Sequence, residues 1–163
     1  MEQAEFIALV RTHQKLIYKI CHSYCQNTQD WQDLEQEVLL QLWSAMPKYD
    51  GRVQISTWIY KVALNTAIAF YRKGKKYKSP KVSIDEQVLA MPDPAGSTIV
   101  NEQLVQLHQF IGALPPLNKA LMLLYLDDYK PKEIAAILGI SRTNVSTKLN
   151  RIKKQLQEQF KKV

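Results

Sequence analysis

Residues 131–154 read PKEIAAILGISRTNVSTKLNRIKK, and this stretch decides the fold of the second half of the chain. Pro131 suits the first turn of a helix, where its missing N–H leaves no hydrogen bond unmade. Gly139 can adopt the left-handed conformation that ends such a helix. The small Ala135 permits close helix crossing, and Val145, six residues after the glycine, packs the second helix against the first. The stretch therefore predicts a helix-turn-helix.

The second helix of this motif, which Ser141 can cap, has an outward face suited to DNA. That face carries hydrogen-bonding and basic side chains, with no carboxylate before Glu158. Such groups meet base edges and phosphates in the major groove. The alternative is a basic helix that faces solvent in a helical bundle, but the turn chemistry and the missing acids favour DNA. The candidate residues are Arg142, Thr143, Ser146, Thr147, Asn150, Arg151 and Lys154.

Helical periodicity also dominates the first half of the chain. Apolar residues recur at spacings of three and four and predict an amphipathic helix over about 4–25. Asn27 can cap a second helix, which Pro47 ends. A third helix covers about 56–74. Because no alternating pattern of useful length occurs, we expect no β-strands.

Residues 76–98 differ from the sequence on either side. They are polar, are punctuated by proline and glycine and show no sustained period, as expected of a linker. Two more helices follow, interrupted by Pro115-Pro116. We therefore expect an all-α protein of two small helical domains, 1–75 and 99–163, joined by a flexible linker, with the helix-turn-helix in the second domain.

Charge is unevenly distributed along the chain. The formal net charge is +7 and the pI is near 9.4, which favours a polyanionic partner. Residues 51–82 carry eight basic side chains and no acidic one, and residues 101–163 have a net charge of +5. Residues 1–50 and 83–100 each have a net charge of −3. Two basic blocks predict two surfaces for an anion, and the acidic start predicts a different partner.

The helix at 56–73 combines aromatic and basic side chains near one face. Single-stranded DNA is held by such stacking platforms together with cations along the backbone, and an amide side chain can read the edge of an unstacked base. Taken alone, core packing explains the aromatic residues at least as well. Beside a helix-turn-helix, DNA binding is the better interpretation. The candidate residues are Trp58, Tyr60, Lys61, Asn65, Arg72 and Lys73.

Cys21 and Cys25 are the only cysteines, spaced by four on a predicted helix. A single pair on one helix is not the pattern of a disulfide-stabilised protein, so the sequence favours a reducing compartment. His22 raises the idea of a metal site, but Cys21 lies on the apolar face and no second ligand cluster accompanies it, so we expect buried structural thiols.

Several functional classes are not expected. The residues assemble no nucleophile–base pair, phosphate loop or metal cluster, so we expect no enzymatic activity, no cofactor and no metal. The N-terminus lacks a signal-peptide pattern, and the apolar runs fall short of the ~20 residues of a membrane span. We therefore expect a cytoplasmic protein without membrane insertion.

Three parts of the chain, in this order, resemble the extracytoplasmic-function (ECF) sigma factors of bacterial RNA polymerase. Asp33–Trp43 resembles the segment with which the family grips the clamp of the largest polymerase subunit. Ser56–Arg72 resembles the segment that melts and reads the −10 promoter element, and Asn65 falls where the family places an asparagine near a captured base. The last part resembles the domain that reads the −35 element, and it comprises Leu114–Leu117, Glu133–Ser141 and Val145–Lys153.

The resemblance implies a sigma factor that binds core RNA polymerase and directs promoter-specific transcription initiation. It implies recognition of the −35 and −10 elements, melting of the −10 region, contacts with the clamp helices and flap of the polymerase, and an anti-sigma factor as a further partner. It assigns the polymerase contact to the acidic helix that Asn27 can cap, with Asp33, Gln36, Glu37 and Gln41 as the contact residues.

The alternative is a helix-turn-helix regulator that binds duplex DNA as a dimer. It leaves the acidic helix and the aromatic-basic helix without a role. A stable dimer in solution favours this alternative, whereas a monomer or a heterodimer with an anti-sigma factor favours the sigma factor.

Overall fold

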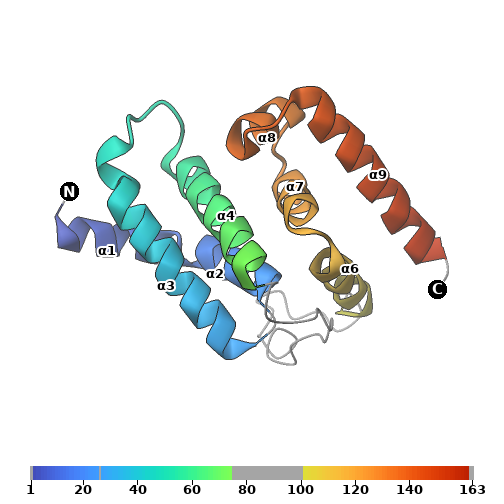
Figure 1. Ribbon diagram of the computed structural model, residues 1–163, viewed down its shortest axis with the longest axis horizontal. Helices are drawn as coiled ribbons and strands as arrows, with labels where there is room; N and C mark the ends of the chain where they lie inside the picture. The colour runs from blue at the N-terminus through green and yellow to red at the C-terminus, as the bar shows by residue number, and fades with distance from the viewer. Residues whose placement is uncertain (1, 26, 75–100, 162–163) are drawn as a thin grey trace. The chain divides into compact units, whose positions relative to one another are not determined.

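The computed structural model describes residues 2–25, 27–74 and 101–161, and all regular structure in these ranges is helical. The all-α prediction is confirmed. The described residues form two compact units, one on each side of residues 75–100 (Figure 1). The linker expected at 76–98 lies outside the described residues. Within these ranges, no helix has the length and hydropathy needed to cross a bilayer.

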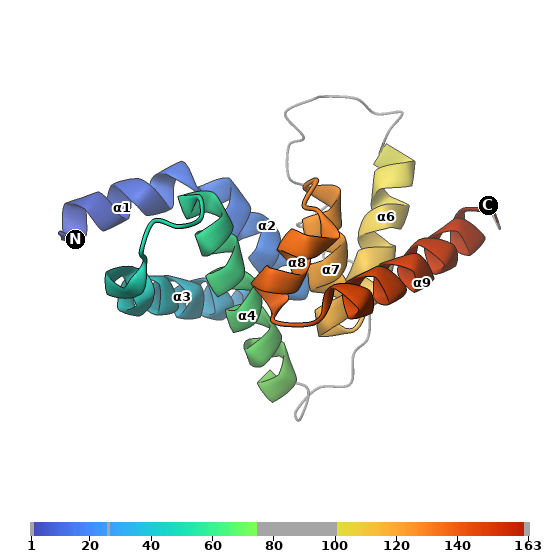
Figure 2. The ribbon, with the colours of Figure 1, turned by 90° about the horizontal axis from the view of Figure 1, so that it is seen from above.

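The first unit is a small helical bundle. Its helices are α1 (Gln3–Thr12), α2 (Gln14–Tyr24), α3 (Thr28–Ala45), the short 3-10 helix η1 (Met46–Lys48) and α4 (Ile55–Gly74). Helices α2, α3 and α4 pack against one another, and α1 packs on α2. Helices α3 and α4 run in opposite directions in Figure 1 and cross in Figure 2.

Helix α3 begins where the sequence predicts. The Oδ1 atom of Asn27 accepts a hydrogen bond from the backbone N–H of Asp30 at 2.8 Å, and its Nδ2 atom donates to Oδ2 of Asp30 at 2.8 Å. A cap of this kind contributes about 1 kcal/mol to helix stability. The Asp30 carboxylate also lies in the first turn, where the helix dipole favours negative charge.

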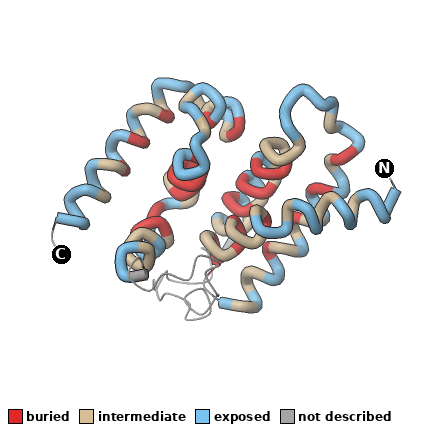
Figure 3. Tube along the Cα trace, turned by 180° about the vertical axis from the view of Figure 1, so that it is seen from behind, coloured by how far each residue is buried: buried red, intermediate tan, exposed pale blue. Residues whose placement is uncertain are grey.

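The core of the first unit comes from the facing sides of α2, α3 and α4 (Figure 3). Cys21 and Cys25 are buried in it, with 0% and 8% of their surface exposed, as predicted. Burial raises the pKa of the Cys21 thiol to about 12, with smaller contributions from Cys25 and Glu35. At neutral pH Cys21 is therefore a protonated packing residue and not a nucleophile.

The single helix predicted over 4–25 is wrong, because the chain forms two helices that meet at His13. This residue has φ −109° and ψ 18°, outside the helical range. Its backbone N–H is shared between the carbonyls of Leu9 and Val10, each at 3.2 Å. Its ring Nδ1 lies 3.0 Å from the Leu9 carbonyl oxygen, so the ring also stabilises the break. The apolar periodicity continues across His13 and gives no sign of this interruption.

The second unit contains the predicted helix-turn-helix. Its described helices are α6 (Asn101–Ala113), α7 (Pro116–Leu126), α8 (Pro131–Leu138) and α9 (Arg142–Lys161). Helices α7, α8 and α9 pack against one another, and α6 packs on α7. The break at Pro115-Pro116 is confirmed, because α6 ends at Ala113 and Pro116 occupies the first turn of α7.

The turn between α8 and α9 has the expected chemistry. Gly139 has φ 69° and ψ 33°, in the left-handed region. Its N–H and that of Ile140 both bond the carbonyl of Ala135, at 2.9 and 3.2 Å. The Oγ atom of Ser141 accepts a hydrogen bond from the backbone N–H of Asn144 at 3.1 Å and so caps α9.

Two glycine-to-alanine changes in this unit are expected to have opposite effects on stability. A Cβ atom at Gly139 or at Gly112 would meet nothing within 4 Å, so neither change introduces a clash. Gly139→Ala is expected to lower the free energy of unfolding by about 1 kcal/mol, because the Cβ atom of alanine is strained at a positive φ, whereas glycine is not. Gly112→Ala is expected to raise it by up to about 1 kcal/mol, because Gly112 lies within α6. Urea unfolding measures both. Equal effects would contradict the left-handed turn.

Candidate nucleic-acid interfaces

The structure brings the residues predicted on α9 to one side of that helix. The opposite side of α9 packs against α7 and α8 through the buried side chains of Val145, Leu149 and Ile152. Ser146 is half-buried and the other predicted residues are exposed. The exposed members are Arg142, Thr143, Thr147, Asn150, Arg151 and Lys154. We call these residues together with Ser146 the α9 face; it spans about 18 Å of helix.

The α9 face is basic and free of carboxylates. The first acidic side chain along α9 is Glu158, one turn beyond Lys154. Lys148 and Lys153, which the sequence analysis did not name, are half-buried and flank the face on either side. Helical spacing alone could have placed both lysines there, because neither falls on the apolar stripe.

A second face lies on α4. Lys61, Asn65 and Arg72 are exposed and recur at spacings of four and seven, so they share one side of the helix. Lys73 is exposed beside them, and Trp58 is half-buried seven residues before Asn65. We call these five residues the α4 face. It combines cations, an amide and an indole, the groups that hold and read unpaired bases.

Tyr60 does not belong to the α4 face, although the sequence analysis placed it there. Its side chain is only 1% exposed. Because successive residues of a helix turn by about 100°, Tyr60 lies towards the core when Lys61 points outward. The Nζ atom of Lys19 on α2 lies 5.3 Å from the centroid of its ring. Tyr60 is therefore part of the α2–α4 packing in this structure.

The loop before α4 contributes groups that the sequence analysis missed, and one of them, the ring of Tyr49, lies next to Trp58. The ring of Tyr49 lies 5.2 Å from that of Trp58, and its hydroxyl donates a hydrogen bond to the carbonyl of Val53. The Asp50 carboxylate accepts a hydrogen bond from the backbone N–H of Arg52 at 3.0 Å. The Arg52 side chain is 88% exposed. In the sequence this loop was visible only as a break between helices.

The residues predicted to contact polymerase lie on α3. Asp33, Gln36 and Gln41 are exposed, and Glu37 is half-buried. The Nε2 atom of Gln41 donates a hydrogen bond to Oε1 of Glu37 at 3.1 Å. Leu40 is 60% exposed and lies in the same row as Asp33 and Gln36, at spacings of seven and four. We call Asp33, Gln36, Glu37, Leu40 and Gln41 the α3 face. It mixes acidic, amide and apolar groups, which suits a protein partner.

The ring of His22 packs against aromatic side chains. The His22 ring lies 3.9 Å from the Tyr18 ring and 4.7 Å from the Trp31 ring, between centroids. No cluster of three or more metal-ligating side chains occurs in the part of the chain that the structure describes.

Two family profiles match the chain, one in each unit. Sigma-70 region 2 matches residues 9–77, and Sigma-70 region 4 matches residues 104–156. The chain is 27% identical to RNA polymerase sigma factor SigV of Bacillus subtilis (strain 168) over 161 residues, which cover 98% of this chain and 93% of that protein. It is also 27% identical to ECF RNA polymerase sigma factor SigW of the same strain over 172 residues, with 98% and 91% covered. The chain belongs to the ECF sigma factors.

Solved structures agree on the fold of this sigma factor. The sigma factor RpoE from Bartonella quintana, in complex with the anti-sigma factor NepR, superposes with a TM-score of 0.73 at 17% identity and covers 96% of this chain and 97% of its own. CnrH in complex with the cytosolic domain of CnrY gives a TM-score of 0.66 at 19% identity, with 98% and 90% covered.

The family membership confirms the predicted resemblance. A sigma factor directs transcription initiation by RNA polymerase, and this is the function of the chain. The alternative of a dimeric helix-turn-helix regulator is not favoured, because it has no place for region 2.

Proposed function

We propose that this sigma factor reads promoter DNA with two helices, α9 on the duplex −35 element and α4 on the −10 element, which it also melts. The observation that carries the proposal is the composition of the two exposed faces. Both combine basic and hydrogen-bonding side chains, and neither α4 nor α9 before Glu158 carries a carboxylate. Duplex DNA is read by such a helix in the major groove, and unpaired bases are held by stacking and phosphate contacts.

We further propose that the α3 face holds the clamp helices of the largest polymerase subunit. Three features support this proposal. The face lies on α3, a different helix from the two proposed to bind DNA; it carries the acidic residues Asp33 and Glu37; and its Leu40 is exposed. Charge complementarity steers and orients such a contact, and an apolar centre excludes water from it.

An anti-sigma factor is the proposed regulatory partner. The support is that one of the sigma factors with a similar fold, RpoE, was solved with the anti-sigma factor NepR. A stable complex of one sigma chain with one partner chain is expected on purification from its own cells.

Run-off transcription tests the proposed function directly. Purified chain and core RNA polymerase are incubated with genomic DNA, and the start sites are mapped. The expected result is a set of starts that share one sequence near −35 and another near −10 and are absent with core polymerase alone. Duplex binding by a dimer of the chain without polymerase, and no new start sites, would contradict it and restore the dimeric regulator.

Replacing Arg151 tests the α9 face. Arg151→Ala is expected to weaken binding of holoenzyme to promoter DNA by roughly 1–3 kcal/mol, if the guanidinium makes a bidentate base contact. Lys161→Ala removes the same charge near the end of α9 and is the matched control, with binding close to that of the wild type. Binding is measured on promoters with single changes in the −35 element. If Arg151→Ala and Arg142→Ala both bind promoter DNA with unchanged affinity, α9 does not lie in the major groove.

A further inference from the structure

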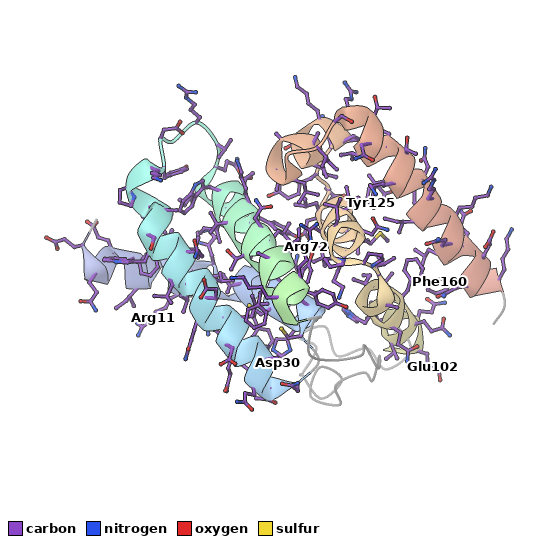
Figure 4. The ribbon with its side chains drawn as sticks, viewed as in Figure 1. Arg11, Asp30, Arg72, Glu102, Tyr125 and Phe160 are labelled. Atoms are coloured by element: carbon purple, nitrogen blue, oxygen red, sulfur yellow. The ribbon has the colours of Figure 1, made fainter. Side chains whose placement is uncertain are left out.

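A contact between α7 and α9 borders the α9 face. The Nζ atom of Lys153 on α9 lies 4.2 Å from the centroid of the Tyr125 ring, in the last turn of α7. An ammonium group above an aromatic ring at this distance is attracted by the negative charge density of the ring face. Tyr125 is 39% exposed, so the contact lies at the surface of the second unit. Figure 4 labels Tyr125 at the end of α7.

Helical geometry places Lys153 at the edge of the α9 face. Residues spaced by three or four share one row of a helix, and Ser146, Asn150 and Lys153 follow this spacing. Arg142 extends the row by one turn. The apolar stripe of α9 points into the core, so Lys153 lies at the edge of the α9 face that adjoins the packed side of the helix.

The chemistry of lysine explains why the ring matters. A lysine side chain is long and flexible, and it loses conformational freedom when it binds a phosphate. A ring that already holds the ammonium in one place removes part of that loss. The ring contacts the ammonium on one side only, so N–H groups remain free to donate to a phosphate oxygen. Phosphates line both edges of the major groove beside an inserted helix.

We propose that Lys153 binds a backbone phosphate beside the −35 element and that Tyr125 is the positioning residue that holds its ammonium at the groove edge. This inference rests on the proposed role of the α9 face in −35 binding. It adds Lys153 to the DNA interface, and it gives Tyr125, at the end of α7 and outside the helix-turn-helix, a role in promoter affinity. Neither residue is needed to read a base.

The test is the salt dependence of promoter binding by holoenzyme. One phosphate contact changes the slope of log K against log salt by about 0.9. Lys153→Ala is therefore expected to reduce the slope by about one, so that its defect shrinks about threefold between about 50 and 200 mM salt. Lys153→Arg, which keeps the charge, retains the slope. Lys161→Ala removes an exposed charge further along α9 and leaves the slope unchanged.

Variants of Tyr125 separate positioning from packing. Tyr125→Phe keeps the ring face and is expected to bind as the wild type does. Tyr125→Leu keeps an apolar side chain without the ring and is expected to weaken binding about two- to fivefold, as a part of the Lys153 contact is lost. The same change made together with Lys153→Ala is expected to add no further loss, because the two residues act as one unit.

The outcomes distinguish this inference from the proposed function. If wild-type holoenzyme binds the promoter in preference to a scrambled fragment but Lys153→Ala keeps the full slope, Lys153 does not contact phosphate and the inference is wrong. If Tyr125→Leu binds as the wild type does, the ring only packs and the positioning role is wrong. If the wild type shows no preference for the promoter, the proposed function fails first.

Discussion

Reversing the charge of Asp33 and Glu37 is expected to abolish co-purification of the sigma factor with core RNA polymerase. Both residues lie on the α3 face and neither is in the core, so Asp33→Lys/Glu37→Lys keeps α3 helical. In the proposed contact, the acidic α3 face meets a basic polymerase surface, so the two lysines would oppose like charges, and like charges across an interface cost several kcal/mol. The measurement is affinity purification of core polymerase, with circular dichroism to confirm the helical fold.

A matched variant separates local charge from total charge. Glu102→Lys/Glu158→Lys changes two exposed acids in the second unit and raises the net charge of the chain by the same amount. This control is expected to co-purify with polymerase. A salt-stable holoenzyme formed by the Asp33/Glu37 variant would show that the acidic side of α3 only faces solvent.

The elements that could be predicted from the sequence are those in which local chemistry and tertiary packing agree. Asn27 caps α3 because its side chain reaches a backbone N–H three residues on, a purely local interaction. Gly139 ends α8 because glycine adopts a positive φ without strain. The exposed side of α9 followed from the spacing of Val145, Leu149 and Ile152. None of these predictions needed knowledge of a distant residue.

The features that were missed depend on side-chain contacts that a residue pattern does not reveal. Tyr60 looked like a surface residue because it stands next to Lys61, and only the packing of α2 on α4 places its ring beside Lys19. The ring of Tyr49 lies next to that of Trp58 because the loop between them folds back, and a sequence pattern does not predict the path of this loop. The break at His13 is accompanied by a contact of its ring with the carbonyl of Leu9, four residues earlier, and apolar periodicity does not reveal such a contact.

The α4 face supports the second large effect, which concerns promoter opening. Opening a duplex costs stacking and pairing energy of about 1.4 kcal/mol per step, so the protein must stabilise the separated strand. The exposed cations Lys61 and Arg72 can hold its phosphates, and Figure 4 labels Arg72 on α4. Lys61→Ala/Arg72→Ala is expected to lower the extent of opening by roughly 10- to 100-fold, since two charge-assisted contacts are lost. Permanganate reactivity of thymines in the −10 region measures opening directly.

A template that is already mismatched through the −10 region is expected to restore most of the activity of this variant, because the melting cost is then absent. The matched control is Arg11→Ala/Lys15→Ala, which removes two exposed cations from α1 and α2 of the same unit and is expected to open the promoter normally. If the two double variants open the duplex equally well, the cations of α4 have no special role in melting.

Asn65 separates base reading from strand holding on the same helix. Its exposed amide lies between Lys61 and Arg72 along one side of α4, and it carries no charge that could hold a phosphate by itself. An amide can donate to and accept from the edge of an extruded base. Asn65→Ala is therefore expected to spare polymerase binding and −35 recognition, and to lose selectivity at one position of the −10 element. Promoters varied at each −10 position in turn measure this loss. Unaltered selectivity, together with normal opening by Lys61→Ala/Arg72→Ala, would make α4 a structural helix and place melting elsewhere in the protein.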